Sequence, residues 1–401
     1  MTTAIAGRVP TEADLERWGS ADQAHRPGRL AALRERMARE GVGAYFGVRR
    51  ENTRYITGFV LAEGEEKGAG NSGQFIVGQD EVIVLADSRY FIQAVEECPE
   101  ARMEKVYNDF PERWAELLTS VGSPKRVGME AGFISHAQWD VLAAAAPDVE
   151  LVAASGWIET LRQVKTADEI ERVAFACAVA DAALERLLPT LKPGLTEHEV
   201  ALALEWEMRT NGAEALAFDV ACLSGPRAAL PHGKPGARRL ASGEVLLFDF
   251  GAQVCGYRSD MTRTLFVGEP SARDLEIYSL VARAQQESQD AIARAIAAGG
   301  TLPSGRAIHQ VSVDLIKAAG HGDHYGHGLG HGIGLATHEM PGLGASAADT
   351  PLPSPTVFTI EPGVYLEGEM GVRIEDVMWL DSADGRLDRL TLFPREVTVV
   401  G

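Results

Sequence analysis

Four carboxylates and one histidine stand in sequence contexts that could together bind metal ions. Two aspartates lie in FDFGAQVCGYRSDMTRT, the histidine lies in GHGLGHGIG, and the glutamates lie in FTIEPGVY and GVRIEDV; they are Asp249, Asp260, His331, Glu361 and Glu375. Four like charges in one place would disfavour their own ionisation unless cations compensated them. Carboxylates with a single imidazole suit hard divalent ions such as manganese, and pairs of ions commonly hydrolyse amides. The pattern therefore predicts a two-metal hydrolase.

The aspartates are arranged about a glycine-bearing turn. Asp249 ends one apolar segment and Asp260 begins another, and the midpoint between them falls near Cys255 and Gly256. If a hairpin closes there, we expect the two carboxylates to be approximate cross-strand neighbours, with Cβ atoms about 4.5–5.5 Å apart.

The glutamates repeat this arrangement. Glu361 and Glu375 are symmetric about Gly368, at the tip of YLEGEMG. Two hairpins that each offer two acids would place four negative charges in one cavity. Divalent cations would then be needed to stabilise the cluster.

The histidine segment has a period of two. Glycine occupies every even position from 326 to 334, while His327 and His331 occupy odd positions. An extended strand would place both histidines on one face and leave the other face bare, so that another backbone could approach closely. A helical pair of metal ligands is disfavoured, because each glycine costs up to about 1 kcal/mol in a helix.

Composition excludes several classes of function. The chain has 401 residues, of which 45% are hydrophobic, so we expect two domains with sizeable cores. A formal net charge of −19 disfavours a nucleic-acid partner. No apolar run is long enough to span a membrane, and the N-terminus has no signal-peptide core. The four cysteines form no CxxC pair, so we expect reduced thiols and a cytoplasmic protein.

The first 160 residues alternate helical and strand patterns. A helix is predicted from Pro27 to Glu40, strands at 44–48, 73–78 and 80–87, and a further helix after Asp87. This alternation is typical of an α/β domain. The glycine-rich stretch at residues 62–73 is predicted to be a loop.

The pattern of predicted helices and strands changes near residues 156–163, where we expect the chain to cross into a second domain. Two capping boxes follow, and each predicts the start of a helix: Thr166 with Glu169, and Thr196 with Glu199. The remainder is strand-rich and carries all five candidate ligands. We therefore expect an α+β catalytic domain in which helices back a curved sheet.

The chain resembles the creatinase, prolidase and aminopeptidase P group of "pita-bread" metallopeptidases over essentially its full length. The motifs that carry the resemblance are DFG…GYRSDMTRT, HGLGHGIGLATHEMPG, EPGVY and GVRIEDV, in that order. SGPRAALPHG, which contains His232, is similar to bacterial Xaa-Pro dipeptidases. The resemblance implies a creatinase-like α/β domain over residues 1–160, followed over residues 161–401 by a pita-bread catalytic domain with a curved antiparallel sheet.

The resemblance also implies how two divalent ions are held. One ion is bound by Asp260, His331, Glu361 and Glu375, and the second by Asp249, Asp260 and Glu375. A hydroxide between the ions is the implied nucleophile. Manganese is the expected metal, with cobalt or zinc as alternatives.

Further site residues follow from the same resemblance. Glu361 is implied to be the general base that then delivers the proton to the leaving nitrogen. His338, in THEMP, is implied to stabilise the oxyanion or to shuttle protons, and His232 to contact the carboxyl side of the substrate.

Arg373 and Tyr365 match positions that form a supporting network with the first aspartate, here Asp249. The alternation of side chains along the strand disfavours a direct contact between Arg373 and a metal, and leaves a hydrogen bond to Asp249 open. His327 is expected to be a supporting or packing residue.

The implied activity is hydrolysis of the bond that precedes proline in short peptides, by a homodimer. An aminopeptidase P that acts on longer peptides is the alternative, and methionine aminopeptidase is disfavoured by the additional residues 1–160. Creatinase-type hydrolysis without metals and a non-enzymatic binding role are also disfavoured, since such relatives lose the ligands that this chain retains. Either residues 62–73 or residues 52–59 are expected to restrict substrate length, from the same or a neighbouring subunit.

Overall fold

The computed structural model describes residue 5, residues 8–61 and residues 70–401. The chain divides into two compact units, one formed by Ala13–Leu161 and the other by Arg162–Gly401 together with Met1–Glu12. Most of the loop predicted at residues 62–73 lies outside the described residues. Its last four residues, 70–73, form a turn before the second strand.

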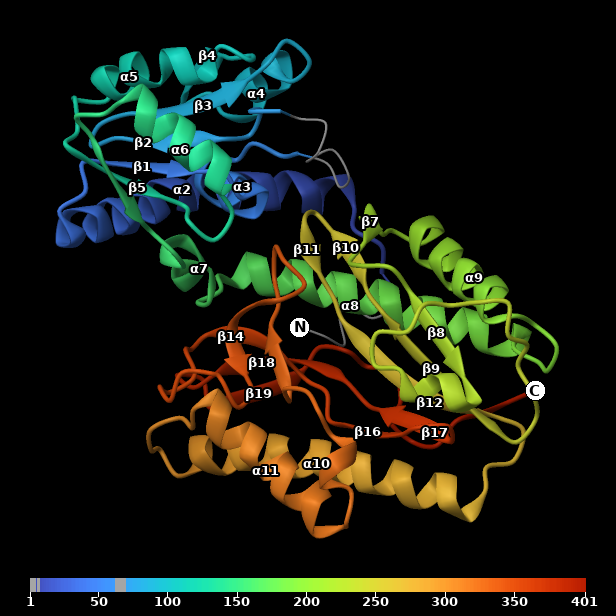
Figure 1. The fold of residues 1–401 in the computed structure, drawn as a ribbon. Helices are drawn as coiled ribbons and strands as arrows, with labels where there is room; N and C mark the ends of the chain where they lie inside the picture. Colours follow the sequence, from blue (N-terminus) through green and yellow to red (C-terminus); the bar gives the residue numbers. More distant parts are fainter. Residues whose placement is uncertain (1–4, 6–7, 62–69) are drawn as a thin grey trace. The chain divides into compact units, whose positions relative to one another are not determined.

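The N-terminal unit contains a mixed sheet and its covering helices (Figure 1). The helices are α2 (Glu12–Glu40), α3 (Arg50–Thr57), α4 (Phe91–Glu97), α5 (Phe110–Ser120), α6 (His136–Ala145) and α7 (Trp157–Arg162). The strands are β1 (Ala44–Gly47), β2 (Phe75–Val77), β3 (Val82–Ala86), β4 (Arg102–Lys105), β5 (Arg126–Met129) and β6 (Glu150–Ala153).

The six strands are ordered β4-β3-β2-β1-β5-β6, with β1, β5 and β6 parallel to one another. Helices α5 and α6 bury apolar side chains against this sheet, and Phe46 contacts both Phe110 and Trp114. The predicted α/β character is confirmed. The predicted start of the first helix at Pro27 is wrong: α2 begins at Glu12, and Trp18 is buried along the earlier turns.

The C-terminal unit is built from long helices and several small sheets. Its helices are α8 (Ala167–Leu187), α9 (Glu197–Thr210), α10 (Ala272–Ala297) and α11 (Gly305–Ala318), with short 3-10 turns η1 (Leu188–Thr190), η2 (Gly225–Ala229) and η3 (Gly322–His324). Its strands are β7 (Ala215–Leu216), β8 (Ala221–Ser224), β9 (Glu244–Phe250), β10 (Ala252–Val254), β11 (Tyr257–Arg258), β12 (Met261–Val267), β13 (Gly330–Gly332), β14 (Glu339–Leu343), β15 (Thr356–Ile360), β16 (Gly363–Leu366), β17 (Met370–Arg373), β18 (Asp376–Asp381), β19 (Arg386–Arg389) and β20 (Val399–Val400).

Both predicted capping boxes are confirmed. The Thr166 hydroxyl accepts a hydrogen bond from the Glu169 amide, and the Glu169 carboxylate accepts one from the Thr166 amide. Thr196 and Glu199 make the same reciprocal pair. These contacts satisfy amide groups that a helix start leaves without an intrahelical partner.

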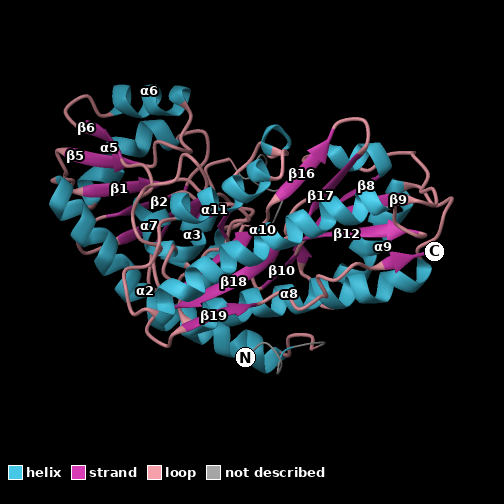
Figure 2. Ribbon diagram, turned by 90° about the horizontal axis from the view of Figure 1, so that it is seen from below, coloured by secondary structure: helices cyan, strands magenta, loops and turns pink. Residues whose placement is uncertain are grey.

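Two sheets carry the candidate site, with strand orders β20-β12-β9-β8 and β14-β13-β15-β18-β19. Their pairings are antiparallel except that β12 and β20 are parallel. Helices α10 and α11 pack apolar side chains against these strands and against β16 and β17. Figure 1 shows α8 on the opposite side of these strands, and Figure 2 shows the same helices and strands from below. The predicted α+β class and the pita-bread architecture are confirmed.

No helix in the described ranges is long and apolar enough to cross a bilayer. Cys98, Cys177 and Cys222 are buried free thiols, and Cys255 is partly exposed.

Candidate metal centre

The aspartate pair is brought together by a hairpin whose tip is Cys255 and Gly256. Both tip residues have positive φ, 46° and 80°, as a tight two-residue turn requires. The register places Asp249 opposite Thr262. The expected cross-strand distance of about 4.5–5.5 Å therefore applies to Asp249 and Thr262 and not to the two aspartates, because the hairpin closes one residue later than the midpoint between them. Asp260 instead precedes Thr262 by two residues and lies diagonally across from Asp249 on the same face.

The glutamate pair follows the predicted symmetry. Strands β16 and β17 pair Gly363 with Arg373, and β15 and β18 pair Ile360 with Asp376. The shared register places Glu361 opposite Glu375 between these two ladders. The glutamate hairpin predicted about residue 368 is confirmed.

The extended strand predicted for residues 326–334 forms only over Gly330–Gly332, as β13. His331 lies on β13, which pairs with β14 and β15. A Cβ atom at Gly330 would lie 2.0 Å from the carbonyl oxygen of Thr359, and one at Gly332 would lie 2.2 Å from that of Met340. The glycines are therefore required because neighbouring backbones approach this strand so closely.

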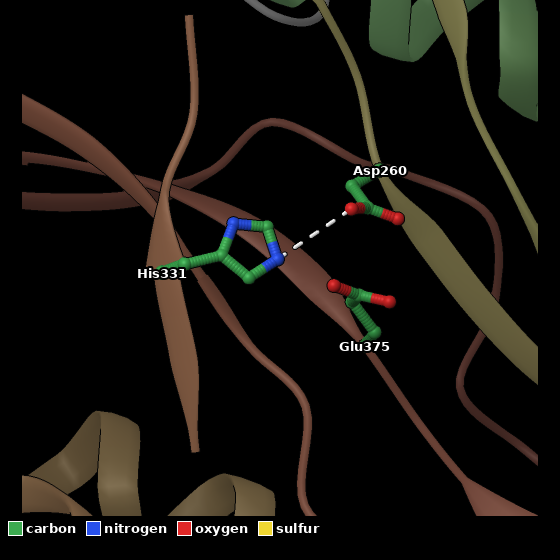
Figure 3. Close-up of side chains that lie close together, drawn as sticks. All are labelled: Asp260, His331 and Glu375. Atoms are coloured by element: carbon green, nitrogen blue, oxygen red, sulfur yellow. Dashed lines mark ion pairs between the residues drawn. The ribbon is translucent and has the colours of Figure 1, made fainter. Parts of the chain in front are cut away.

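Three side chains from these separate segments point toward one another (Figure 3). One ligand atom each from Asp260, His331 and Glu375 lies within 4.8 Å of the others. His331 Nε2 is 3.6 Å from Asp260 Oδ2 and 3.3 Å from Glu361 Oε1. The other ring nitrogen, Nδ1, lies 3.1 Å from the Gly332 carbonyl oxygen, which can only accept. In neutral His331 the proton therefore resides on Nδ1, and Nε2 keeps a lone pair for a metal.

Arg373 links Asp249 and Glu375 through hydrogen bonds. Its guanidinium donates to Asp249 Oδ2 at 2.5 Å, to the Tyr365 hydroxyl at 2.9 Å and to the Thr262 hydroxyl at 2.8 Å. Thr262 in turn donates to Glu375 Oε2 at 2.7 Å. These contacts fix the orientation of two acids from behind.

His327 extends the same chain of contacts. Its Nδ1 lies 2.7 Å from the Gly328 carbonyl oxygen, so that nitrogen donates. Its Nε2 then accepts from the Tyr365 hydroxyl at 2.9 Å. His327 therefore supports Tyr365 and, through it, Arg373.

The acids are electrostatically strained in the absence of a cation. Burial raises the pKa of Asp260 well above its usual range, and the charge of Glu375 raises it further. Burial also raises the pKa of Glu375, and the charge of Glu361 adds to this effect. For Glu361 burial acts in the same direction, but the hydrogen bond and charge of His331 outweigh it and lower the pKa.

The donor set fits a divalent cation. Within this cluster of described residues, three buried carboxylate oxygens have no hydrogen-bond partner: Asp249 Oδ1, Asp260 Oδ1 and Glu375 Oε1. Unpartnered buried charges are costly, and a metal ion would satisfy all three. Oxygen donors with one imidazole match the preference of hard divalent ions.

A cavity of about 420 Å³ opens onto this cluster. Eight of the nine predicted site residues line it: His232, Asp249, Asp260, His331, His338, Glu361, Arg373 and Glu375. Tyr365 does not line the cavity and lies behind Arg373. Phe218, Pro231, Gly328 and Gly330 also line it and were not predicted, although Pro231 directly precedes His232 in the motif.

His232 is placed by the packing of η2 on β17. A Cβ atom at Gly371 would lie 2.0 Å from the carbonyl oxygen of Ala228, so these two backbones are in direct contact. This contact holds Pro231 and His232 beside Arg373, whose guanidinium is 3.4 Å from the Pro231 carbonyl oxygen.

A buried ion cluster lies directly beside His338. Glu339 binds Arg162 and also accepts from Lys165 Nζ at 2.8 Å, and all three side chains are about 2% exposed. Burial alone would raise the pKa of Glu339, but the charges of Arg162 and Lys165 outweigh it and hold the pKa at about 2. Because this pKa is below its unfolded value, the stabilisation is present above about pH 4.5 and is lost as the pH falls toward 2.

Replacing Glu339 by glutamine is expected to lower the free energy of unfolding at pH 7 by about 3–5 kcal/mol, because two buried cations lose their counter-ion. Urea titration would measure this. The matched control is Glu276→Gln, which breaks an exposed pair with Arg273 and is expected to cost less than about 1 kcal/mol. Equal effects for the two variants would refute a stabilising role of the buried cluster.

Two family models match the chain. The model described as metallopeptidase family M24 matches residues 171–382, and the model described as the creatinase/prolidase N-terminal domain matches residues 29–164. Together they cover both units.

Individual proteins are similar over most of the chain. A Bacillus subtilis protein named uncharacterized peptidase YqhT is 33% identical over 374 residues, which cover 93% of this chain and 100% of that protein. The Xaa-Pro dipeptidase of Pyrococcus furiosus is 39% identical over 240 residues, 60% of this chain and 66% of that protein.

Solved structures with the same fold carry two different names. The Xaa-Pro dipeptidase from Bacillus anthracis has a TM-score of 0.83 and 32% identity, covering 93% of this chain and 99% of that chain. The X-Pro aminopeptidase from Thermotoga maritima has a TM-score of 0.81 and 31% identity, covering 92% of this chain and 99% of that chain.

Proposed function

The chain belongs to metallopeptidase family M24, and we propose that it hydrolyses the peptide bond that precedes proline in short peptides. The observation that carries this proposal is the convergence of four carboxylates and His331 on one cavity that also holds His232 and His338. Similar proteins named Xaa-Pro dipeptidase support the choice of substrate. The cavity volume lies within the usual range for small-molecule sites.

Two divalent ions would be held by the carboxylate cluster. We assign one ion to Asp260, His331, Glu361 and Glu375, and the second to Asp249, Asp260 and Glu375. When bound, the ions would polarise the scissile carbonyl and lower the pKa of water toward about 7. Manganese best matches the oxygen-rich donor set, with cobalt or zinc as alternatives. The buried carboxylate oxygens that have no partner among the described residues support this assignment.

Glu361 would move the proton during the reaction. As the oxygen of a water molecule attacks the carbonyl carbon, Glu361 accepts a proton from that water. It then delivers the proton to the proline nitrogen as the carbon–nitrogen bond breaks. The guanidinium of Arg373 lies 4.0 Å from the Glu361 carboxylate, and its positive charge favours the ionised form that accepts the proton.

His338 would stabilise the negative charge that develops on the carbonyl oxygen. Desolvation and the charge of His331 lower the pKa of His338 to about 4. At neutral pH its imidazole is therefore neutral and offers one N–H donor. A donor placed where charge develops stabilises the transition state more than the substrate.

The far side of the cavity would bind the proline end of the substrate. His232 would contact the terminal carboxylate, and Phe218 and Pro231 supply apolar surface beside it. Arg373 and Tyr365 would hold Asp249 in position rather than contact substrate.

A peptide panel tests the proposal. The chain is stripped with a chelator, reloaded with Mn²⁺, and assayed on Gly-Pro, Ala-Pro, Gly-Ala and Ala-Pro-Ala. We expect hydrolysis of Gly-Pro and Ala-Pro, none of Gly-Ala, and loss of activity when chelator is returned. Failure to cleave any proline peptide with manganese, cobalt or zinc would refute the proposal.

The same panel separates the alternative activity. The similarity to the X-Pro aminopeptidase structure makes hydrolysis of longer peptides the second candidate. Faster cleavage of Ala-Pro-Ala than of Ala-Pro would favour it. Creatine hydrolysis without metal would revive a creatinase-type activity, which the retention of all five ligands argues against.

We further propose that the chain acts as a homodimer in the cytoplasm. The family resemblance supports the dimer, and the buried free thiols of Cys98, Cys177 and Cys222 support a reducing compartment. In this assembly either residues 62–73 or residues 52–59 would limit substrate length. Sedimentation at equilibrium would measure the mass, and a single-chain value of 43.0 kDa would contradict the dimer.

A further inference from the structure

Phe218 and His338 lie far apart in the sequence, and the residues that precede them belong to the same hydrogen-bonded cluster. Phe218 follows Ala217, just after β7, and His338 follows Thr337, just before β14. Both Phe218 and His338 line the cavity. The position of each side chain therefore depends on how the preceding residue is held.

Arg258, on β11, contacts both preceding residues. Its Nη1 donates to the Ala217 carbonyl oxygen at 2.9 Å and to the Thr337 hydroxyl at 3.0 Å. The Thr337 hydroxyl donates to the same Ala217 carbonyl at 3.1 Å. The three groups thus form a closed triangle, and we call it the Arg258 clamp.

Burial and further hydrogen bonds hold the Arg258 clamp in place. Arg258 and Thr337 are both buried, and the backbone amide of Arg258 donates to the Gly334 carbonyl oxygen at 2.9 Å. Arg258 Nε also donates to Gln253 Oε1, across the short hairpin of β10 and β11, which lies beside β7 in Figure 1. A fork of donors with fixed geometry suits such a role better than a flexible ammonium group.

We propose that Arg258 and Thr337 are positioning residues that set His338 and Phe218, which line the same cavity, at the spacing that the reacting peptide requires. Neither residue lines the cavity, so both act through the residues that follow Ala217 and Thr337 in the chain. The kinetic part of the inference rests on the proposed function. A misplacement of about 1 Å in a catalytic site can cost about 100-fold in rate.

The test uses variants at Thr337 because they are small changes. Thr337→Val keeps the shape and removes the hydroxyl, whereas Thr337→Ser keeps the hydroxyl. We expect Thr337→Val to lower kcat on Ala-Pro by about 10- to 100-fold, with KM changed by less than about 3-fold. Thr337→Ser is expected to retain kcat within about 3-fold of the unmodified enzyme.

Thr356→Val is the matched control. Thr356, on β15, is also buried, and its hydroxyl has no partner within the described residues. This control is expected to leave kcat and KM unchanged. A fall in kcat for Thr337→Val that serine rescues, and that the control does not share, supports the clamp.

A crystal structure of the Thr337→Val variant gives a readout that does not depend on activity. We expect the His338 ring to move away from its present position, 4.1 Å between centroids from the His331 ring. Unchanged kinetics, an impaired Thr337→Ser variant or an unmoved His338 ring would each overturn the clamp. If the unmodified protein cleaves no proline peptide, the proposed function fails, and the position of the ring alone decides the clamp.

Discussion

Replacing Asp260 by asparagine is expected to lower the rate of Xaa-Pro hydrolysis by at least about 100-fold. Loss of a residue that only supports a metal ligand costs up to about 100-fold in activity, and loss of a ligand itself should cost at least as much. Asp260 lies between His331 and Glu375 and offers an oxygen with no partner among the described residues. An asparagine side chain has the same shape but presents only one oxygen and no charge. Steady-state kinetics with Mn²⁺ would measure the loss.

The same substitution should stabilise the metal-free protein. Burial and the charge of Glu375 raise the folded-state pKa of Asp260, so ionisation above its unfolded pKa weakens the fold. Each pKa unit of this shift corresponds to about 1.4 kcal/mol. We therefore expect the metal-free asparagine variant to unfold at higher urea concentration than the unmodified protein at pH 7.

Added manganese should reverse that order. Ligand at 100 times its Kd stabilises a folded protein by about 2.7 kcal/mol, and only a chain with an intact site gains this. The matched control is Asp384→Asn, on an exposed turn, which should follow the unmodified protein in every assay. An Asp260→Asn variant that loses metal-free stability and gains as much from manganese would contradict the proposed ligand role.

Replacing Glu361 by glutamine is expected to lower kcat by about 10²- to 10⁴-fold, the range of a positioned general base. The change removes the proton acceptor, while Asp260, His331 and Glu375 remain grouped. Manganese affinity should therefore fall less than activity. Single-turnover kinetics at saturating Mn²⁺, beside a calorimetric titration, would separate the two effects.

Glu367→Gln is the control for that variant. Glu367 lies on the exposed tip of the same hairpin, next to Gly368. It should leave both kcat and metal affinity unchanged. A Glu361→Gln enzyme within about 3-fold of the unmodified rate would remove Glu361 from the proton transfer.

The sequence predicted best those features that depend on local chemistry. Capping pairs such as Thr166 with Glu169 satisfy their own helix start, so a stretch of four residues suffices to specify them. Alternating glycines imply an extended strand that another backbone can approach, and Gly330 and Gly332 confirm this. The symmetry of Glu361 and Glu375 was readable because their hairpin turns at a glycine, Gly368.

The strand register of the aspartate hairpin was harder to predict from the sequence. The tip residues Cys255 and Gly256 were identified, but a shift of one residue in the turn changes which residue faces Asp249. Asp260 still shares the face of Asp249, because a displacement of two residues preserves the side of the sheet. The prediction of convergence thus survived an error in the pairing itself.

Long-range polar contacts left no local signal. Arg162 and Glu339 are 177 residues apart, and nothing near either one indicates its partner. The same holds for Arg258, which meets Thr337 from 79 residues away. Such contacts arise only once the sheets are assembled, so they emerged from the structure alone.

Anomalous scattering from a crystal of the manganese-loaded chain would locate the ions among the five proposed ligands. We expect two peaks per chain at the manganese edge. Asp260 and Glu375 should each contact both ions. His331 and Glu361 should contact one ion, and Asp249 should contact the other. Peaks elsewhere, or no peak among these five side chains in a preparation that cleaves Ala-Pro, would contradict it.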